Sequence, residues 1–205
     1  MAATALAKIK TIASDPVLRM RIFFLVAALA VFRLLAAIPI PGVDHVRLEQ
    51  FMSNNQFFGL LSVFSGGGFS QLSIVMLGVG PYITASIIMQ LATVIFPQVK
   101  AMYSEEGDAG RTKFIAWSRM LTIPLAILQA VAFLSLLSTQ GILGALAPFD
   151  FAVNVFLVAA GSIFLMWLGE LITEFGIGNG VSLLIFAGIV GHLPASFSQA
   201  LFTAD

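Results

Sequence analysis

Hydrophobic residues follow one another in long runs along this chain, and polar residues are confined to short stretches between the runs. No Asp, Glu, Lys or Arg occurs between Gln50 and Val99. A membrane-spanning helix needs about 20 apolar residues, each adding about 1.5 Å of length. The runs predict spans at 22–38, 73–96, 114–137, 151–172 and 181–201. The pattern therefore predicts an all-α membrane protein with five transmembrane helices.

One apolar segment is too short to cross a membrane. Residues 57–64 are apolar, and the run Gly66-Gly67-Gly68 follows them closely. A helix that enters the bilayer and turns back leaves backbone groups that lipid cannot satisfy, so it must be buried in protein or line a watery cavity. Half-helices of this kind mark the transport pathway in many membrane proteins. We therefore expect a re-entrant half-helix over 57–69, in a channel or a transporter.

The first span has a marked beginning. Asp15 followed by Pro16 predicts a helix N-cap and a proline at the first helical position. A signal peptide is the alternative, because Lys8, Lys10, Arg19 and Arg21 precede the apolar core. That core contains Arg33, which suits a cleavable segment poorly.

Basic residues predict the orientation of the chain. They gather in the N-terminal tail and again in the loop after the second span, at Lys100, Arg111 and Lys113. The positive-inside rule puts both regions in the cytoplasm. Two crossings must then separate them, so the segment 57–64 does not cross. Five crossings place the C-terminus outside, and an odd number of spans is what one half of an inverted-topology repeat has.

Composition supports the membrane class and excludes several chemistries. Hydrophobic residues make up 59% of the chain and charged residues 10%, against about a quarter charged in soluble domains. The formal net charge is zero, so no basic field suggests a nucleic-acid partner. There is no cysteine, which removes disulfides and thiol chemistry. His45 and His192 lie far apart, and we expect no metal and no cofactor.

Six short motifs are distributed along nearly the whole chain. They are RLLAAIPIPG at 33–42, FSGGG at 64–68, LGVGPYITASIIMQ at 77–90, EGDAGR at 106–111, LGE at 168–170 and GIGNGVSLLIFAGIV at 176–190. In this order and spacing they resemble SecY, the channel-subunit family of the bacterial protein-conducting translocon. Phe175 and Glu105 depart from the residues common in the family. The family has ten spans in two pseudosymmetric halves, and this chain resembles only the first half.

The resemblance implies a function and a set of partners. It implies a channel that is not an enzyme, whose energy source lies on partner proteins, and through which signal sequences and unfolded polypeptides pass. The implied partners are SecE and SecG in the membrane, the SecA motor or a ribosome, and a C-terminal half of the same channel. The implied location is the bacterial cytoplasmic membrane, with the N-terminus in the cytoplasm.

Two pairs of isoleucines are candidates for a pore ring. Ile83 and Ile87 lie on one face of the second span, and Ile185 and Ile189 repeat that spacing on the fifth. Ordinary interhelical packing also explains this spacing. The resemblance implies a ring of branched apolar side chains that excludes water and ions at rest and flexes around a passing peptide.

The resemblance also assigns a plug and a lateral gate. The re-entrant segment is similar to a plug that seals the outer funnel, and a fixed re-entrant helix is the alternative. The predicted plug residues are Gly59, Leu60, Leu61, Phe64, Ser65, Gly66, Gly67 and Gly68. The second and third spans would form one side of the gate. There Gln90, Thr122 and Gln129 would make interhelical hydrogen bonds that hold the gate shut, or serve as static contacts.

Other polar residues have weaker assignments. A predicted cytoplasmic loop with Glu106, Gly107, Gly110, Arg111 and Lys113 would contact a soluble partner or only anchor the topology. Arg33 is the one charge deep in a predicted span, which makes it a functional candidate, although a structural role is favoured. Glu170 and Glu174 lie one turn apart, as an acid/base pair or, more simply, as a solvated helix end.

Three other functions fit parts of the pattern. Half of an inverted-repeat secondary transporter also has broken helices and an odd span count, but it should carry a charged or coordinating residue near the midplane. The regions around Ile83 and Ile185 are apolar. An intramembrane protease needs a Ser/His or paired-Asp constellation inside the spans, and no Asp or His lies at a predicted span centre. A non-conducting structural membrane subunit is the third alternative.

Overall fold

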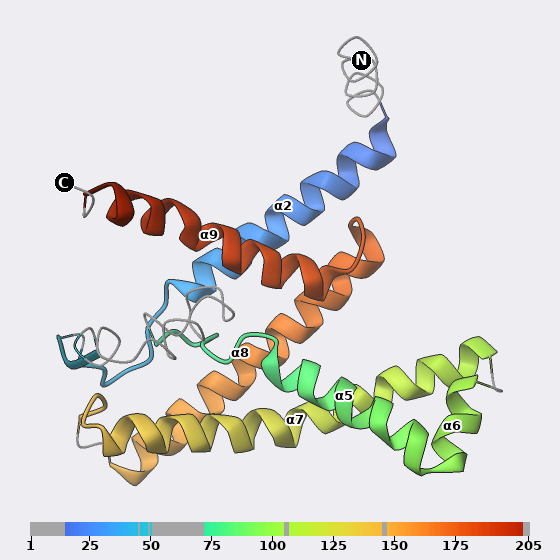
Figure 1. Cartoon of the computed structure of the whole chain (residues 1–205), viewed down its shortest axis with the longest axis horizontal. Coiled ribbons are helices and arrows are strands. Elements are labelled where there is room, and N and C mark those ends of the chain that lie inside the picture. The colour runs from blue at the N-terminus through green and yellow to red at the C-terminus, as the bar shows by residue number, and fades with distance from the viewer. Residues whose placement is uncertain are drawn as a thin grey trace.

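The computed structural model describes residues 15–44, 46–48, 50, 72–104, 107–144 and 147–202, with side chains as far as Gly191 in the last helix. These ranges form the helices α2 (Pro16–Ala36), α5 (Gly80–Ile95), α6 (Pro97–Ser104), α7 (Gly107–Thr139), α8 (Pro148–Phe175) and α9 (Gly180–Phe202) (Figure 1). The described part of the chain is helical apart from turns and two isolated bridges, Pro39–Ser73 and Val43–Leu143. The all-α class is thus confirmed. The predicted plug segment 57–69 lies outside the described residues.

The first described helix begins as the sequence predicts. The Asp15 carboxylate accepts a hydrogen bond of 2.9 Å from the backbone N–H of Val17, and Pro16 is the first helical residue. A side-chain acceptor at the N-cap satisfies a backbone N–H that has no partner inside the helix. Proline fits the next position because its missing N–H is not needed there.

The second predicted span begins later than its apolar run. The expected start at Ser73 is wrong, because residues 74–79 form successive turns and α5 begins at Gly80. Gly78 has a φ of 58°, a left-handed conformation that interrupts a helix and that glycine adopts readily. Its N–H donates to the carbonyl of Val75, at 2.8 Å. Apolar composition alone does not distinguish such buried turns from a helix.

The predicted cytoplasmic loop is largely helical. α5 ends at Ile95, and α6 departs from it at an angle of 108°. After the undescribed pair 105–106, α7 begins at Gly107. Arg111 and Lys113 therefore lie on the first turns of a helix, where the sequence predicted a loop.

α8 is the central helix of the described fold. It contacts α2, α5, α7 and α9, while α5 runs beside α7 (Figure 1). One core cluster includes Leu134 of α7 and Val158 of α8. A second cluster includes Phe32 of α2, Leu165 of α8 and Leu184 of α9. α8 therefore belongs to both cores and joins them.

Length and composition identify candidate membrane spans among the described helices. α7 and α8 are long and apolar enough to cross a membrane, and the bent pair α5–α6 would make a third span. The apolar part of α9, Gly180–Gly191, is shorter than a span needs to be, and α2 contains three arginines, Arg19, Arg21 and Arg33. By length and composition, neither helix is therefore counted as a candidate span. The chain is a multi-pass membrane protein, and the count of five crossings stays a prediction.

Candidate functional site: a cavity between four helices

A cavity of about 640 Å³ lies between α5, α7, α8 and the beginning of α9. One part of its wall is aliphatic and formed by Ile83, Ile87, Ile115, Val181 and Ile185. The other part is polar and formed by Tyr82, Ser86, Gln90, Arg119, Glu170, Thr173, Glu174, Asn179 and Ser182. The cavity thus combines branched apolar side chains with polar groups that can form hydrogen bonds.

The structure brings three of the four predicted ring residues to this cavity. Ile83 and Ile87 reach it from α5 and Ile185 from α9. Ile189 is half-buried one turn further along α9 and is not part of the lining. Ile83 and Ile185 also pack against the core formed by α2, α8 and α9, whereas the Ile87 side chain is 50% exposed. The pore-ring role itself stays a prediction.

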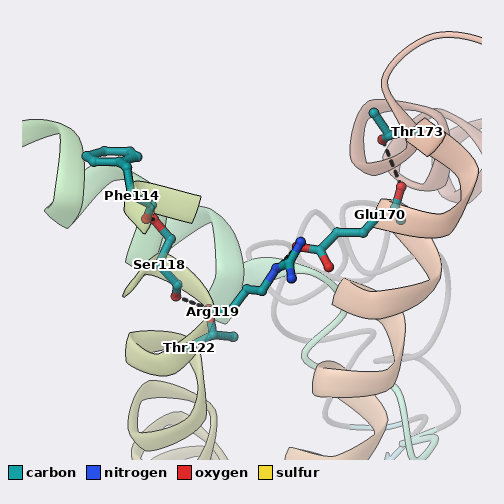
Figure 2. Close-up of polar contacts among 7 residues, drawn as sticks. Phe114, Ser118, Arg119, Thr122, Glu170 and Thr173 are labelled. Carbon is teal, nitrogen blue, oxygen red and sulfur yellow. Dashed lines mark hydrogen bonds and ion pairs between the residues drawn. The ribbon is translucent and has the colours of Figure 1, made fainter. Parts of the chain in front are cut away.

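An ion pair crosses from α7 to α8 at the cavity wall. The Nε–H of Arg119 donates to the Oε1 of Glu170 at 2.5 Å (Figure 2). The Glu170 side chain is 19% exposed and the Arg119 side chain 49%. The interpretation of Glu170 as a solvated helix end is therefore wrong. Sequence reasoning missed this pair because 51 residues separate the two positions and no local pattern links them.

The glycine-rich motif at 176–180 folds into the connection between α8 and α9. The Thr173 hydroxyl donates to the Gly169 carbonyl at 2.9 Å and accepts from the Gly180 N–H at 2.8 Å. The Asn179 side chain accepts a hydrogen bond from the Ser182 N–H at 3.1 Å. Gly178 has a φ of 77°, which favours glycine. These bonds fix the first turn of α9 and so place Val181 and Ile185 at the cavity.

Close approach of the two backbones supports the same arrangement. A Cβ added at Gly180 would overlap the carbonyl oxygen of Gly169 on α8. Small residues at helix contacts let membrane helices approach this closely. The glycines of the motif therefore serve packing as well as the turn.

The predicted gate residues have different environments. Gln90 is exposed and lines the cavity, and Gln129 is half-buried on α7. Thr122 is buried, and its hydroxyl donates to the Ser118 carbonyl of its own helix at 2.8 Å (Figure 2). The Thr122 hydroxyl therefore does not donate the expected hydrogen bond to another helix. The gate role of all three stays a prediction.

The remaining candidates fall outside the cavity. Gly110 is buried on α7, Arg111 and Lys113 are exposed, and Glu106 lies outside the described residues. The Arg33 guanidinium lies against Gly191 of α9, where an added Cβ would overlap it. This contact supports the structural interpretation of Arg33. Within the part of the chain that the structure describes, no group of three His, Cys, Asp or Glu side chains could hold a metal ion.

The fold and the cavity define a class, a helical multi-pass membrane protein with a mixed apolar and polar cavity between its helices. The SecY family model matches residues 73–204. The protein translocase subunit SecY of Corynebacterium glutamicum is 42% identical over 193 residues, which cover 88% of this chain and 44% of that protein. The Pseudomonas aeruginosa subunit of the same name is 43% identical over 186 residues, which cover 90% of this chain and 42% of that protein. The chain belongs to the SecY family.

Two solved structures have a similar fold. Sec61 in the canine ribosome-channel complex from the endoplasmic reticulum gives a TM-score of 0.61 at 23% identity, over 83% of this chain and 36% of that chain. A second structure, described as a protein conducting channel, gives a TM-score of 0.55 at 25% identity, over 80% and 34%. The chain spans less than half the length of the curated relatives that it matches.

Proposed function

We propose that this chain forms one half of a protein-conducting channel that moves unfolded polypeptides across a membrane and releases signal sequences into the lipid. The observation that carries the proposal is the cavity lined by Ile83, Ile87 and Ile185. These three residues lie on helices that match protein translocase subunits over nearly the whole chain.

The lining of the cavity supports a non-specific conduit. Branched apolar side chains at a constriction exclude water and ions at rest and adapt to a passing chain. Beside them, Ser86, Gln90 and Ser182 offer hydroxyl and amide groups to a polypeptide backbone. Such a wall favours neither one side-chain type nor one sequence, as a channel for many substrates requires.

The direction of passage follows from the basic residues. The positive-inside rule puts the N-terminus and α6 on the cytoplasmic side, and α8 then runs back to that side and ends at Phe175. The cavity lies beside this end of α8, at Glu170, Thr173 and Glu174. It would thus be the cytoplasmic entrance, with segment 57–69 as a plug beyond it and Gln90, Thr122 and Gln129 on the side that opens to lipid.

The account requires partners. A C-terminal half of the same channel would close the open side of the cavity and supply the rest of the ring, which is consistent with the length of the relatives. SecE and SecG would accompany it in a bacterial cytoplasmic membrane. The SecA motor or a ribosome would supply the substrate and contact the surface near Glu106, Gly107, Gly110, Arg111 and Lys113.

One observation favours the alternative of a secondary transporter half. Arg119 and Glu170 are charged residues at the cavity wall, and charged residues inside a membrane commonly mark ion and substrate sites. Their mutual ion pair, the position of Glu170 near the C-terminal end of α8 and the family membership favour the channel.

Reconstitution separates the two functions. The full-length protein, purified with its membrane partners, is placed in vesicles, and a radiolabelled secretory precursor is added with the motor and ATP. We expect precursor that is protected from protease only in vesicles that contain the protein. Accumulation of a small solute without any protected precursor would contradict the channel proposal and support a transporter.

A further inference from the structure

We propose that the Arg119–Glu170 ion pair is a positioning element that sets the separation of Ile83 and Ile87 on α5 from Ile185 on α9. The effect of this separation on transport rests on the proposed channel function. The separation itself is a property of the fold and can be measured without transport.

The helices that carry the isoleucines have different main packing partners. α5 packs along α7, and α9 packs on α8 and α2. In the ranges that the structure describes, the backbone of α5 does not approach that of α9 and approaches α8 only over a short stretch, although the Ile83 side chain packs against the core of α2, α8 and α9. The beginning of α5 is held on α8 by the turns that precede it. Further along α5, the separation of Ile87 from Ile185 depends on how α7 sits against α8.

The apolar contact between α7 and α8 lies away from the cavity. Ala130 and Leu134 of α7 belong to the same buried cluster as Val155 and Val158 of α8. Arg119 precedes Ala130 by 11 positions in the sequence, about 16 Å along a helix. A change of angle at the apolar contact would therefore displace the cavity end of α7 more than the contact itself.

The ion pair is suited to limit that movement. It reaches from α7 to α8 at the cavity (Figure 2), and its Nε–Oε1 distance is 2.5 Å. Glu170 is 19% exposed, so its attraction to Arg119 is screened less than that of a surface pair. Without Arg119, a partly buried carboxylate would lose its partner, which is unfavourable. The pair thus favours the angle between α7 and α8 that the structure shows.

The test measures the separation directly. Spin labels are attached to cysteines at Leu91 on α5 and Phe186 on α9, which are 57% and 62% exposed. The 205 residues contain no other cysteine. The full-length protein, purified with its membrane partners in lipid vesicles and with any remaining cysteine replaced, is compared with Arg119→Gln, with Glu170→Gln and with the exchanged pair Arg119→Glu plus Glu170→Arg. Glu174→Gln is the matched control, since it removes the same charge from the same cavity wall without an ion pair.

We expect both single neutral variants to broaden the distance distribution and lengthen its mean, and the exchanged pair to restore it. The ratio of the wider to the narrower state should rise about 3- to 18-fold, the factor that corresponds to the free energies of interhelical polar contacts in membranes. Glu174→Gln should leave the distribution unchanged. Unchanged distances in both single variants would overturn the proposal, and so would a failure of the exchanged pair to restore them. Failure of the transport assay alone would bear on the proposed function and not on this inference.

Discussion

At the residue scale, single glycines decide how closely segments of this chain approach one another. Gly161 of α8 leaves room for the buried turns before α5, since an added Cβ would overlap the Ile74 carbonyl oxygen. The next residue, Ser162, donates from its hydroxyl to the Gly78 carbonyl at 2.8 Å. These two neighbours hold the turns against α8 and so fix where α5 begins.

Substitution of Gly161 tests this arrangement. We expect Gly161→Ala to lower the free energy of unfolding by about 1–3 kcal/mol, because the obstacle is backbone that must move. Gly80→Ala is the control, since nothing lies within 4 Å of a Cβ at that position. Thermal unfolding of the purified protein in detergent measures both. Equal melting temperatures for the two variants would show that Gly161 does not set the approach.

Local residue signals were predictable from sequence, and contacts over long separations were not. The Asp15 cap was predicted because capping depends on neighbouring residues. The Arg119–Glu170 pair was missed because it depends on the relative placement of two helices. The contact of Arg33 with Gly191 has the same origin. A single sequence carries no signal for either pairing.

At the scale of elements, apolar runs located the later helices well and misjudged their neighbours. The predicted spans 114–137 and 151–172 fall inside α7 and α8, which extend beyond them at both ends. Polar helix ends lie outside an apolar run, so hydropathy cannot detect them. The same limitation explains why α6 was taken for a loop. The late start of α5 has the opposite cause, since buried turns are as apolar as a helix.

The turn between α8 and α9 gives an element-scale prediction. Gly178 has a φ of 77°, a conformation that costs an alanine about 1–2 kcal/mol. We expect Gly178→Ala to weaken the first turn of α9, because that turn depends on the bonds of Thr173 and Asn179.

Hydrogen exchange in the segment 179–185 measures this effect. Exchange there should become several-fold faster in Gly178→Ala, while the centre of α8 keeps its protection. Gly80→Ala again serves as the control, because its φ is not in the left-handed region. If exchange at the start of α9 stays as slow as in the unmodified protein, the glycine is not needed for the turn.

At the scale of the whole molecule, helices far apart in the sequence meet around one cavity. Ile83 and Ile87 on α5 face the same space as Ile185 on α9. The spacing of Ile83 and Ile87 alone predicted only that they share a face of one helix. The prediction that they lie near Ile185 came from the resemblance to the family. The chain spans 44% of the relative from Corynebacterium glutamicum. Under the proposed function, the cavity is one side of a larger passage.

Polar substitution at the cavity tests the seal. We expect Ile87→Asn and Ile185→Asn each to raise the resting ion permeability of vesicles that contain the full-length protein. The reason is that an amide retains water in a constriction that an isoleucine keeps dry. Val94→Asn is the control, on the same helix but outside the cavity and 82% exposed. Ion currents across a planar bilayer measure the effect. Equal currents for Val94→Asn and Ile87→Asn would place the seal elsewhere.

The most direct test of the central claim is to ask whether a translocating polypeptide touches the cavity. A photoreactive residue is placed at Ile87, at Ile185 or at Phe156, a residue of α8 that is 66% exposed and outside the cavity lining. A radiolabelled precursor is arrested part-way through the full-length channel, and the cross-links are resolved by gel. The account predicts cross-links from Ile87 and Ile185 that disappear when the precursor is released, and none from Phe156. Cross-links from Phe156 alone, or from none of the three positions while the precursor is arrested, would contradict it.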